Sequence, residues 1–298
     1  MLTNPFYIEF KKERDLGAII SDTFKFIREN WKQYFKTVLK IIGPFLAVGA
    51  ALLIFAFISY SKASATLLNG SSADNNMFFN TFGNMFIWIF VLMILWGIIY
   101  TLLAEVSLFY IKSYIQNNGI INFEEIKTNT FKNMWKFLGL GMVSIIMLLV
   151  GYVLCFLPMV YLSVVLFLAM PIMAFESKSI TDTISHCFTL ISGEWWNTFG
   201  VVLILGILVG VLGLAFSVPS IIYQFINTGI NIQNDDPTKM LEFIDNPIYI
   251  ILNVLAYFGK FLLYSVTLIS SAFVYFDLNE KKNLTGTYER IDSLGNYN

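Results

Sequence analysis

Long uninterrupted runs of hydrophobic residues dominate the chain. A helix rises 1.5 Å per residue, so about 20 apolar residues cross the roughly 30 Å hydrocarbon core of a bilayer. The runs reach or approach this length, and each of them predicts one membrane-spanning helix. They lie near residues 38–59, 85–111, 137–157, 159–175, 199–224 and 248–276.

The stretch 137–175 is the one place where the pattern leaves the number of crossings open. It holds 39 residues without a charged break, or about 58 Å of helix, which is nearly two bilayer cores. Pro158 lies near its middle, where it can end one helix and begin the next. Two short spans joined by a tight turn are one interpretation. One bent span is the other, and it would invert the topology of everything downstream.

The distribution of lysine and arginine favours six spans, because cytoplasmic loops carry an excess of these residues. With six spans, 16 of the 19 Lys and Arg residues fall in cytoplasmic segments, and Lys62 and Lys239 fall in outer loops. Lys260 lies inside the sixth span. With five spans the division is 13 inside against five outside. We therefore expect an all-α polytopic membrane protein with about six transmembrane helices and both termini in the cytoplasm.

An amphipathic segment precedes each predicted hairpin. Between residues 16 and 35 apolar side chains recur every three or four positions and basic side chains occupy the other face, the pattern of a helix that lies in the membrane interface. Asn122 with Glu125, and Ser179 with Asp182, have the spacing of N-caps at the start of the second and third segments. Three tryptophans close these segments as interfacial anchors: Trp31, Trp135 and Trp195.

These segments suggest an internal repeat, in which an interfacial elbow helix leads into a transmembrane hairpin. The copies cover about 15–111, 122–175 and 179–277, within a single membrane domain 1–282 followed by a cytoplasmic tail 283–298. The sequence Ile-Ser-Asp-Thr at 20–23 is similar to Ile-Thr-Asp-Thr at 180–183. A true repeat is one explanation. The other is that any interfacial helix before a span carries Trp and basic residues.

Composition supports lipid as the solvent and excludes several functions. Only 13% of residues are charged and mean hydropathy is +0.68, against roughly 25% charged residues in soluble domains. The net charge of −1 provides no basic field for nucleic acid. Cys155, Cys187 and His186 are too few for a metal site, and we expect no disulfide, no metal and no cofactor.

Two ionisable residues lie inside predicted spans, where such residues usually face protein or a water-filled cavity. Glu105, about one quarter of the way into the second span from its cytoplasmic end, either hydrogen-bonds to the elbow helices or lines a cavity. Lys260 lies near the middle of the sixth run. It can pair with an acid, line a cavity or extend its amine toward the interface.

Other candidate residues lie at the ends of spans or in glycine-rich stretches. Glu176 closes the fourth span and Asp277 the sixth, and each is expected to tether the third elbow helix. Small residues spaced four apart permit close contact between helices, within one chain or between two copies. In the fifth span these residues are Gly206, Gly210 and Gly213.

Features from the fourth predicted span onward resemble those of a known family, and the resemblance covers most of the chain. The features are Leu-Pro-Met-Val-Tyr-Leu at 157–162, Phe175-Glu176, Leu-Ile-Ser-Gly-Glu-Trp-Trp at 190–196 and Tyr-Phe-Asp-Leu at 275–278. They resemble an uncharacterised bacterial membrane-protein family that includes the membrane domain of some glycerophosphodiester phosphodiesterases. The resemblance implies the architecture and a bacterial cytoplasmic (inner) membrane. The catalytic barrel of those enzymes, about 250 residues, has no counterpart in this sequence.

No nucleotide loop, nucleophile elbow or metal-hydrolase motif occurs in the sequence, so no catalytic residue is assigned and we expect a protein that is not an enzyme. The leading hypothesis is a membrane scaffold or accessory subunit of a membrane complex. Its partners would be membrane lipids, and another membrane protein or a second copy. The alternative is a small-solute transporter or channel that uses Lys260 and Glu105.

Overall fold

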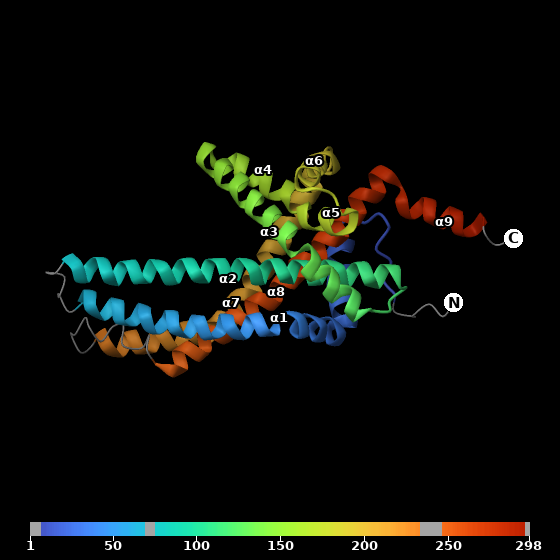
Figure 1. Cartoon of the computed structure of the whole chain (residues 1–298). Coiled ribbons are helices and arrows are strands. Elements are labelled where there is room, and N and C mark those ends of the chain that lie inside the picture. Colours follow the sequence, from blue (N-terminus) through green and yellow to red (C-terminus); the bar gives the residue numbers. More distant parts are fainter. Residues whose placement is uncertain (1–6, 69–74, 233–245, 296–298) are drawn as a thin grey trace. The chain divides into compact units, whose positions relative to one another are not determined.

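The computed structural model describes residues 7–68, 75–232 and 246–295, and these residues form helices joined by short connections (Figure 1). The described helices are α1 (Leu16–Leu68), α2 (Asn75–Gln116), α3 (Phe123–Leu154), α4 (Phe156–Leu166), α5 (Ala169–Glu176), α6 (Ile180–Ile191), α7 (Trp195–Ile232), α8 (Pro247–Asn283) and α9 (Thr285–Gly295).

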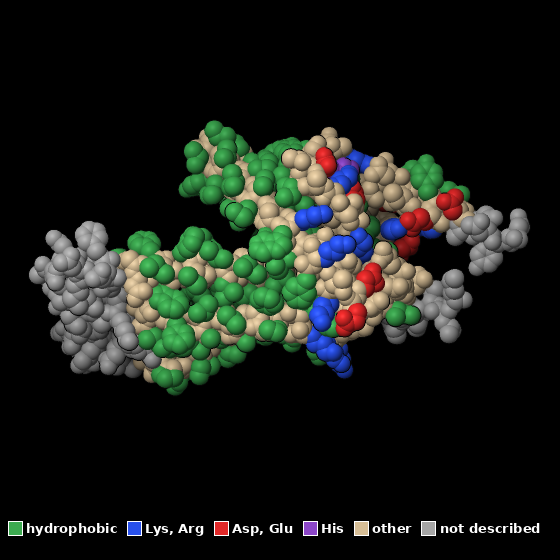
Figure 2. Space-filling view, viewed as in Figure 1, with side chains coloured by type: hydrophobic (Ala, Val, Ile, Leu, Met, Phe, Trp, Pro, Cys, Tyr) green, Lys and Arg blue, Asp and Glu red, His purple; other side chains and the backbone are tan. Residues whose placement is uncertain are grey.

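Six segments of the described chain are long and apolar enough to cross a membrane. They are Leu16–Tyr60, Phe82–Gln116, Phe123–Leu154, Phe156–Glu176, Trp195–Gly229 and Pro247–Asn283. Many large apolar side chains on them point outward, as Figure 2 shows for one face. Such a surface needs lipid around it, because soluble monomers rarely expose large contiguous apolar patches. The prediction of an all-α, multi-pass membrane protein is confirmed.

The stretch 137–175 contains two candidate spans, as the charge distribution predicted. The chain turns at Cys155, three residues before Pro158. Pro158 lies in the first turn of α4, where its missing N–H has no helical partner to lose. A Cβ on Gly151 would lie 3.1 Å from the Met159 main chain, so glycine allows α3 and α4 to fold back closely (Figure 1).

The three elbows differ from one another in the structure. The first two are continuous with their spans, since α1 and α3 run through residues 36–40 and 136–141 without a break. Only the third forms a separate helix, α6, which a turn at Gly193 (φ +84°) separates from α7. Glycine adopts such a positive φ readily, and the first two segments have no turn of this kind. The caps at Asn122 and Ser179 are confirmed.

The chain divides into two compact units, each assembled from separate segments. The first unit comprises Met1–Ile42, Thr101–Val209 and Tyr264–Asn298, and the second comprises Gly43–Tyr100 and Gly210–Leu263. The boundaries fall inside α1, α2, α7 and α8. In the second unit, Trp96 packs against Tyr257 and Phe261 with ring centroids 6.5 Å apart in both pairs.

The two cysteines give a direct test of topology. Cys155 is exposed at the turn between α3 and α4, whereas Cys187 is buried in α6 and burial raises the pKa of its thiol to about 12. Because the thiolate is the reactive form, Cys187 should stay unmodified at pH 8. We expect a membrane-impermeant maleimide added outside intact cells to label Cys155 and to leave Cys187 unlabelled. Labelling of Cys155 only from inverted vesicles would contradict the predicted orientation.

Candidate functional site

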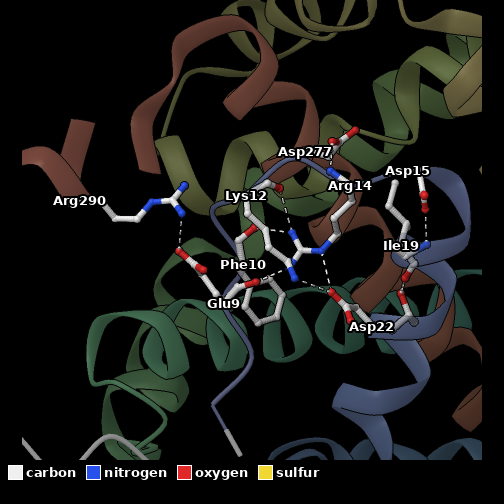
Figure 3. A network of polar contacts seen from close by, with 11 residues as sticks. Glu9, Phe10, Lys12, Arg14, Asp15, Ile19, Asp22, Asp277 and Arg290 are labelled. Atoms are coloured by element: carbon white, nitrogen blue, oxygen red, sulfur yellow. Dashed lines mark hydrogen bonds and ion pairs between the residues drawn. The ribbon is translucent and has the colours of Figure 1, made fainter. Parts of the chain in front are cut away.

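One network of polar contacts in the first unit is built around the segment that precedes α1, residues 7–15, hereafter the N-terminal segment (Figure 3). Phe10 is buried and stacks on Phe273 of α8 with centroids 4.3 Å apart. The main-chain N–H of Ile8 donates to the hydroxyl of Tyr114 on α2 at 3.0 Å. The N-terminal segment is therefore part of the packed core of the first unit.

Arg14 is the centre of this arrangement, and its side chain is 0% exposed. Its Nε lies 2.9 Å from Asp22 Oδ2, and its Nη1 donates to the carbonyl oxygens of Phe10 (2.7 Å) and Lys12 (3.1 Å). Its Nη2 donates to the carbonyl oxygen of Glu9. Burial lowers the pKa of Arg14, and the hydrogen bond and charge of Asp22 oppose this shift. The guanidinium thus fixes the path of the N-terminal segment on α1.

Asp277, a residue predicted from the sequence, joins α8 to the same network. Its Oδ1 accepts the main-chain N–H of Arg14 at 2.7 Å, and its Oδ2 lies 3.0 Å from Lys281 Nζ. Lys281 also lies 3.4 Å from Glu194, in the turn after α6. A hydrogen bond from Asn197 and the charge of Lys281 lower the pKa of Glu194. The expected tether to the third elbow therefore passes from Asp277 through Lys281.

A cavity of about 580 Å³ opens beside this network. Both cations in its wall are already bonded to carboxylates, so no free cation is left there to hold an anionic ligand. The polar lining residues are Glu13, Arg14, Asp15, Asn197, Thr198, Asp277 and Lys281. Among the described residues, no group of three or more His, Cys, Asp or Glu side chains could hold a metal ion.

The C-terminal segment, expected only as a tail, forms helix α9 and binds the N-terminal segment. Glu280, 2% exposed, accepts the main-chain N–H groups of Gly286 (2.6 Å) and Thr287 (2.8 Å) and so caps α9. Lys11 pairs with Glu289 at the other contact. The sequence does not single out Glu280, because it lies in a charged stretch that is typical of solvated tails.

Glu176 contacts α6, as the sequence predicted for the third elbow. Its Oε1 accepts the hydroxyl of Tyr275 at 2.8 Å and lies 3.3 Å from His186 Nε2, while its Oε2 lies 2.6 Å from Lys178 Nζ. His186 belongs to α6. Glu176 therefore links the end of α5 to both α6 and α8.

The two intramembrane candidates lie in different units. Glu105 is in the first unit and is buried, but neither carboxyl oxygen has a hydrogen-bond partner among the described residues. The predicted hydrogen bond to the elbow helices is therefore wrong. Lys260 is in the second unit, with an exposed side chain whose Nζ lies 5.7 Å from the Tyr257 ring centroid. Neither residue lines the cavities at Arg14, at Lys112 or at Trp88.

The glycine and tryptophan predictions have mixed outcomes. A Cβ at Gly206 or Gly210 would meet no described atom within 4 Å, so the expected close contact inside the chain is wrong at both positions. A Cβ at Gly213 would lie 3.7 Å from Lys260 Cγ, an ordinary contact. Trp31 and Trp135 are 52% and 76% exposed, and their place at a membrane interface stays a prediction. Trp195 instead stacks on Phe199 with centroids 5.1 Å apart.

A second candidate site is a group of exposed basic residues, hereafter the basic surface. Its members lie on α1 and α3 and make no ion pair with any described residue. The two helices meet at this surface where Lys40 Nζ of α1 lies 5.2 Å from the ring centroid of Phe123 in α3. Figure 2 shows several Lys and Arg side chains gathered on one face. The basic surface comprises Lys25, Arg28, Lys32, Lys36, Lys40, Lys127, Lys132 and Lys136.

Searches of protein-family models, curated proteins and solved structures found no match to the chain. The fold alone therefore defines its class, a polytopic α-helical membrane protein, and the family resemblance stays a prediction.

Proposed function

We propose that the protein is a non-enzymatic scaffold or accessory subunit of a bacterial cytoplasmic membrane, and that its basic surface binds anionic lipid headgroups. The observation that supports this proposal is a row of exposed cations without ion-pair partners in the described chain. Groups of four to eight Lys and Arg residues beside a membrane-spanning helix are typical binding sites for anionic lipids.

The spacing of these cations on α1 supports lipid binding. Lys25, Arg28, Lys32, Lys36 and Lys40 follow one another at three- or four-residue intervals, so they share one face of the helix. They lie in the part of the segment Leu16–Tyr60 that leads into the apolar run beginning near residue 38, where long basic side chains reach the headgroup region. The exposed ring of Trp31 in the same row suits that region as well.

A small-solute transporter is the second candidate function, and the buried carboxyl group of Glu105 favours it. Lys260 adds no support, because its side chain is exposed and lines none of the three cavities. We therefore prefer the scaffold to the transporter as the proposed function.

The lipid-binding proposal predicts a selective loss when the row on α1 is neutralised. We expect K25Q/R28Q/K32Q/K36Q/K40Q to weaken phosphatidylglycerol binding by about tenfold or more, since each cation near an anionic surface contributes about 1 kcal/mol. Binding of phosphatidylcholine should not change. Native mass spectrometry of the detergent-solubilised protein with each lipid measures both affinities.

The matched control is K25R/R28K/K32R/K36R/K40R, which keeps every charge and should bind phosphatidylglycerol like the wild type. Equal phosphatidylglycerol binding by the neutralised variant would exclude the basic surface as the lipid site. Purification in mild detergent that always returned a lone monomer, without lipid or partner protein, would contradict the scaffold proposal as a whole.

A further inference from the structure

Glu105 places a carboxyl group inside a membrane-spanning helix without a polar partner. Its side chain is 0% exposed, and neither Oε1 nor Oε2 is hydrogen-bonded within the part of the chain that the structure describes. A bare carboxylate in apolar surroundings is so unfavourable that the group takes up a proton instead. Glu105 is therefore in the neutral form, which carries one O–H donor.

The neighbours of Glu105 on α2 show which helices its side chain faces. Phe109, one turn further on, packs against Phe137 of α3 with centroids 5.9 Å apart. Lys112, two turns further on, donates from Nζ to the carbonyl oxygen of Ala174 in α5 at 2.8 Å. Residues 105, 109 and 112 share one face of a helix. Glu105 consequently faces the space between α3 and α5.

Two independent contacts give the depth of Glu105. The ends of α2 and α5 line one cavity, which includes Lys112 and Phe175. Seven positions back along each chain, about 10 Å, lie Glu105 and Leu168. On α3, one turn beyond Phe137, a Cβ on Gly141 would lie 3.8 Å from Met170 Cε. Both contacts place Glu105 level with the junction of α4 and α5.

The main chain at this junction departs from helical hydrogen bonding. The N–H of Leu168 donates to the carbonyl oxygen of Val165 (3.3 Å) rather than to that of Val164. Pro171 has no N–H to donate to the carbonyl oxygen of Phe167. The carbonyl oxygen of Phe167, which lacks its helical donor, thus lies near the level of Glu105, whose O–H group needs an acceptor. Interrupted membrane helices are tolerated where protein buries them, and such breaks form ion sites in transporters.

No charged side chain within residues 7–68, 75–232 and 246–295 competes for this site. The facing segment from Phe137 to Phe175 contains no Asp, Glu, Lys, Arg or His, and its Tyr152, Cys155 and Tyr161 are exposed. Three other titratable groups on α1, α2 and α8 near this level are already hydrogen-bonded: Tyr34 to Ser107, Lys112 to Ala174 and Tyr275 to Glu176. The remaining two, Tyr110 and Tyr264, are uncharged phenols.

We propose that Glu105 and the α4–α5 junction form an intramembrane proton-binding site, separate from the lipid-binding function. Glu105 holds a proton at neutral pH and shares it in a hydrogen bond to the carbonyl oxygen of Phe167, whose helical donor is missing at Pro171. On release the proton passes to a water molecule, the carboxylate keeps the electron pair of the O–H bond, and the junction opens to admit that water. Proton binding thereby stabilises the packing of α3 and α5 against α2.

Infrared spectroscopy of the full chain in lipid tests this site. At neutral pH the wild type should show the C=O band of a protonated carboxylic acid, and Glu105→Gln should lack it. The band should shift on transfer to D2O, since a bound proton that is released also exchanges. Glu176→Gln, which alters a partly exposed carboxyl group, should retain the band as the matched control.

Chemical labelling of the wild type provides a second test, which does not depend on whether Glu105→Gln folds. A hydrophobic carbodiimide reacts with protonated carboxyl groups in apolar surroundings, so peptide mapping of the wild type should find it on Glu105 and not on Glu176. Absence of both the band and the adduct overturns the proposal, as does a band that never shifts in D2O. Loss of the band when NaCl replaces KCl would show that the site binds sodium instead of a proton.

Discussion

Replacing Arg14 by methionine is expected to reduce the free energy of unfolding by about 3–5 kcal/mol, because removing one member of a buried charge network is strongly destabilising. Asp22 would keep only its 3.5 Å contact with Lys12. Methionine keeps much of the length of the side chain but offers no donor to Asp22 or to the carbonyl oxygens of Phe10 and Lys12. Thermal and chemical unfolding in detergent measures the loss. Limited proteolysis should also cleave the N-terminal segment of the variant.

Lys12→Met is the matched control, because Lys12 pairs with the same carboxylate, Asp22, at 3.5 Å. The Lys12 side chain is 43% exposed, and exposed ion pairs contribute less than about 1 kcal/mol. The control should unfold close to the wild type and keep its N-terminal segment protected. If both variants lost the same stability, the burial of Arg14 would have no special role.

The sequence predicted the membrane-spanning part of this fold well, because lipid imposes a simple rule on it. Backbone polar groups in hydrocarbon must pair within the segment, so a long apolar run has to be a helix. The charge distribution then decided the difficult stretch around Pro158, where two helices, α3 and α4, replace one. The elbows were harder, since the end of an interfacial segment depends on a local turn such as Gly193.

The candidate site was predicted only in part, because its contacts join residues far apart in the chain. Glu176 and Asp277 were found by their place at the ends of spans. Arg14 was counted merely as one of many basic residues before the first span, and only the packed structure shows that its side chain is buried against Asp22. Lys260 is a candidate because it lies near the middle of the sixth apolar run, although its side chain is exposed in the structure. Depth in a run does not determine which face of a helix a residue occupies.

The contact between the two ends of the chain gives the other large expected effect. A Cβ added to Gly286, in the first turn of α9, would lie 2.3 Å from the carbonyl oxygen of Lys11 and 2.7 Å from its Cβ. Because the added Cβ would collide with a main-chain atom of Lys11, which cannot rotate away as a side chain could, the N-terminal segment or α9 must move. We expect Gly286→Ala to reduce the free energy of unfolding by about 1–3 kcal/mol, the usual cost of overpacking, as measured by thermal unfolding in detergent.

Gly17→Ala makes the same chemical change in the first turn of α1, where the new Cβ would lie 3.5 Å from Asp15 Oδ1, an ordinary contact. An alanine that fits without strain restricts the unfolded chain and stabilises by up to about 1 kcal/mol, so the two variants should change stability in opposite directions. The main-chain N–H of Gly286 also donates to Glu280. A displaced α9 would therefore lose its cap, and proteolysis at the C-terminus of Gly286→Ala should accelerate. A Gly286→Ala protein as stable as Gly17→Ala would show that α9 does not pack on Lys11.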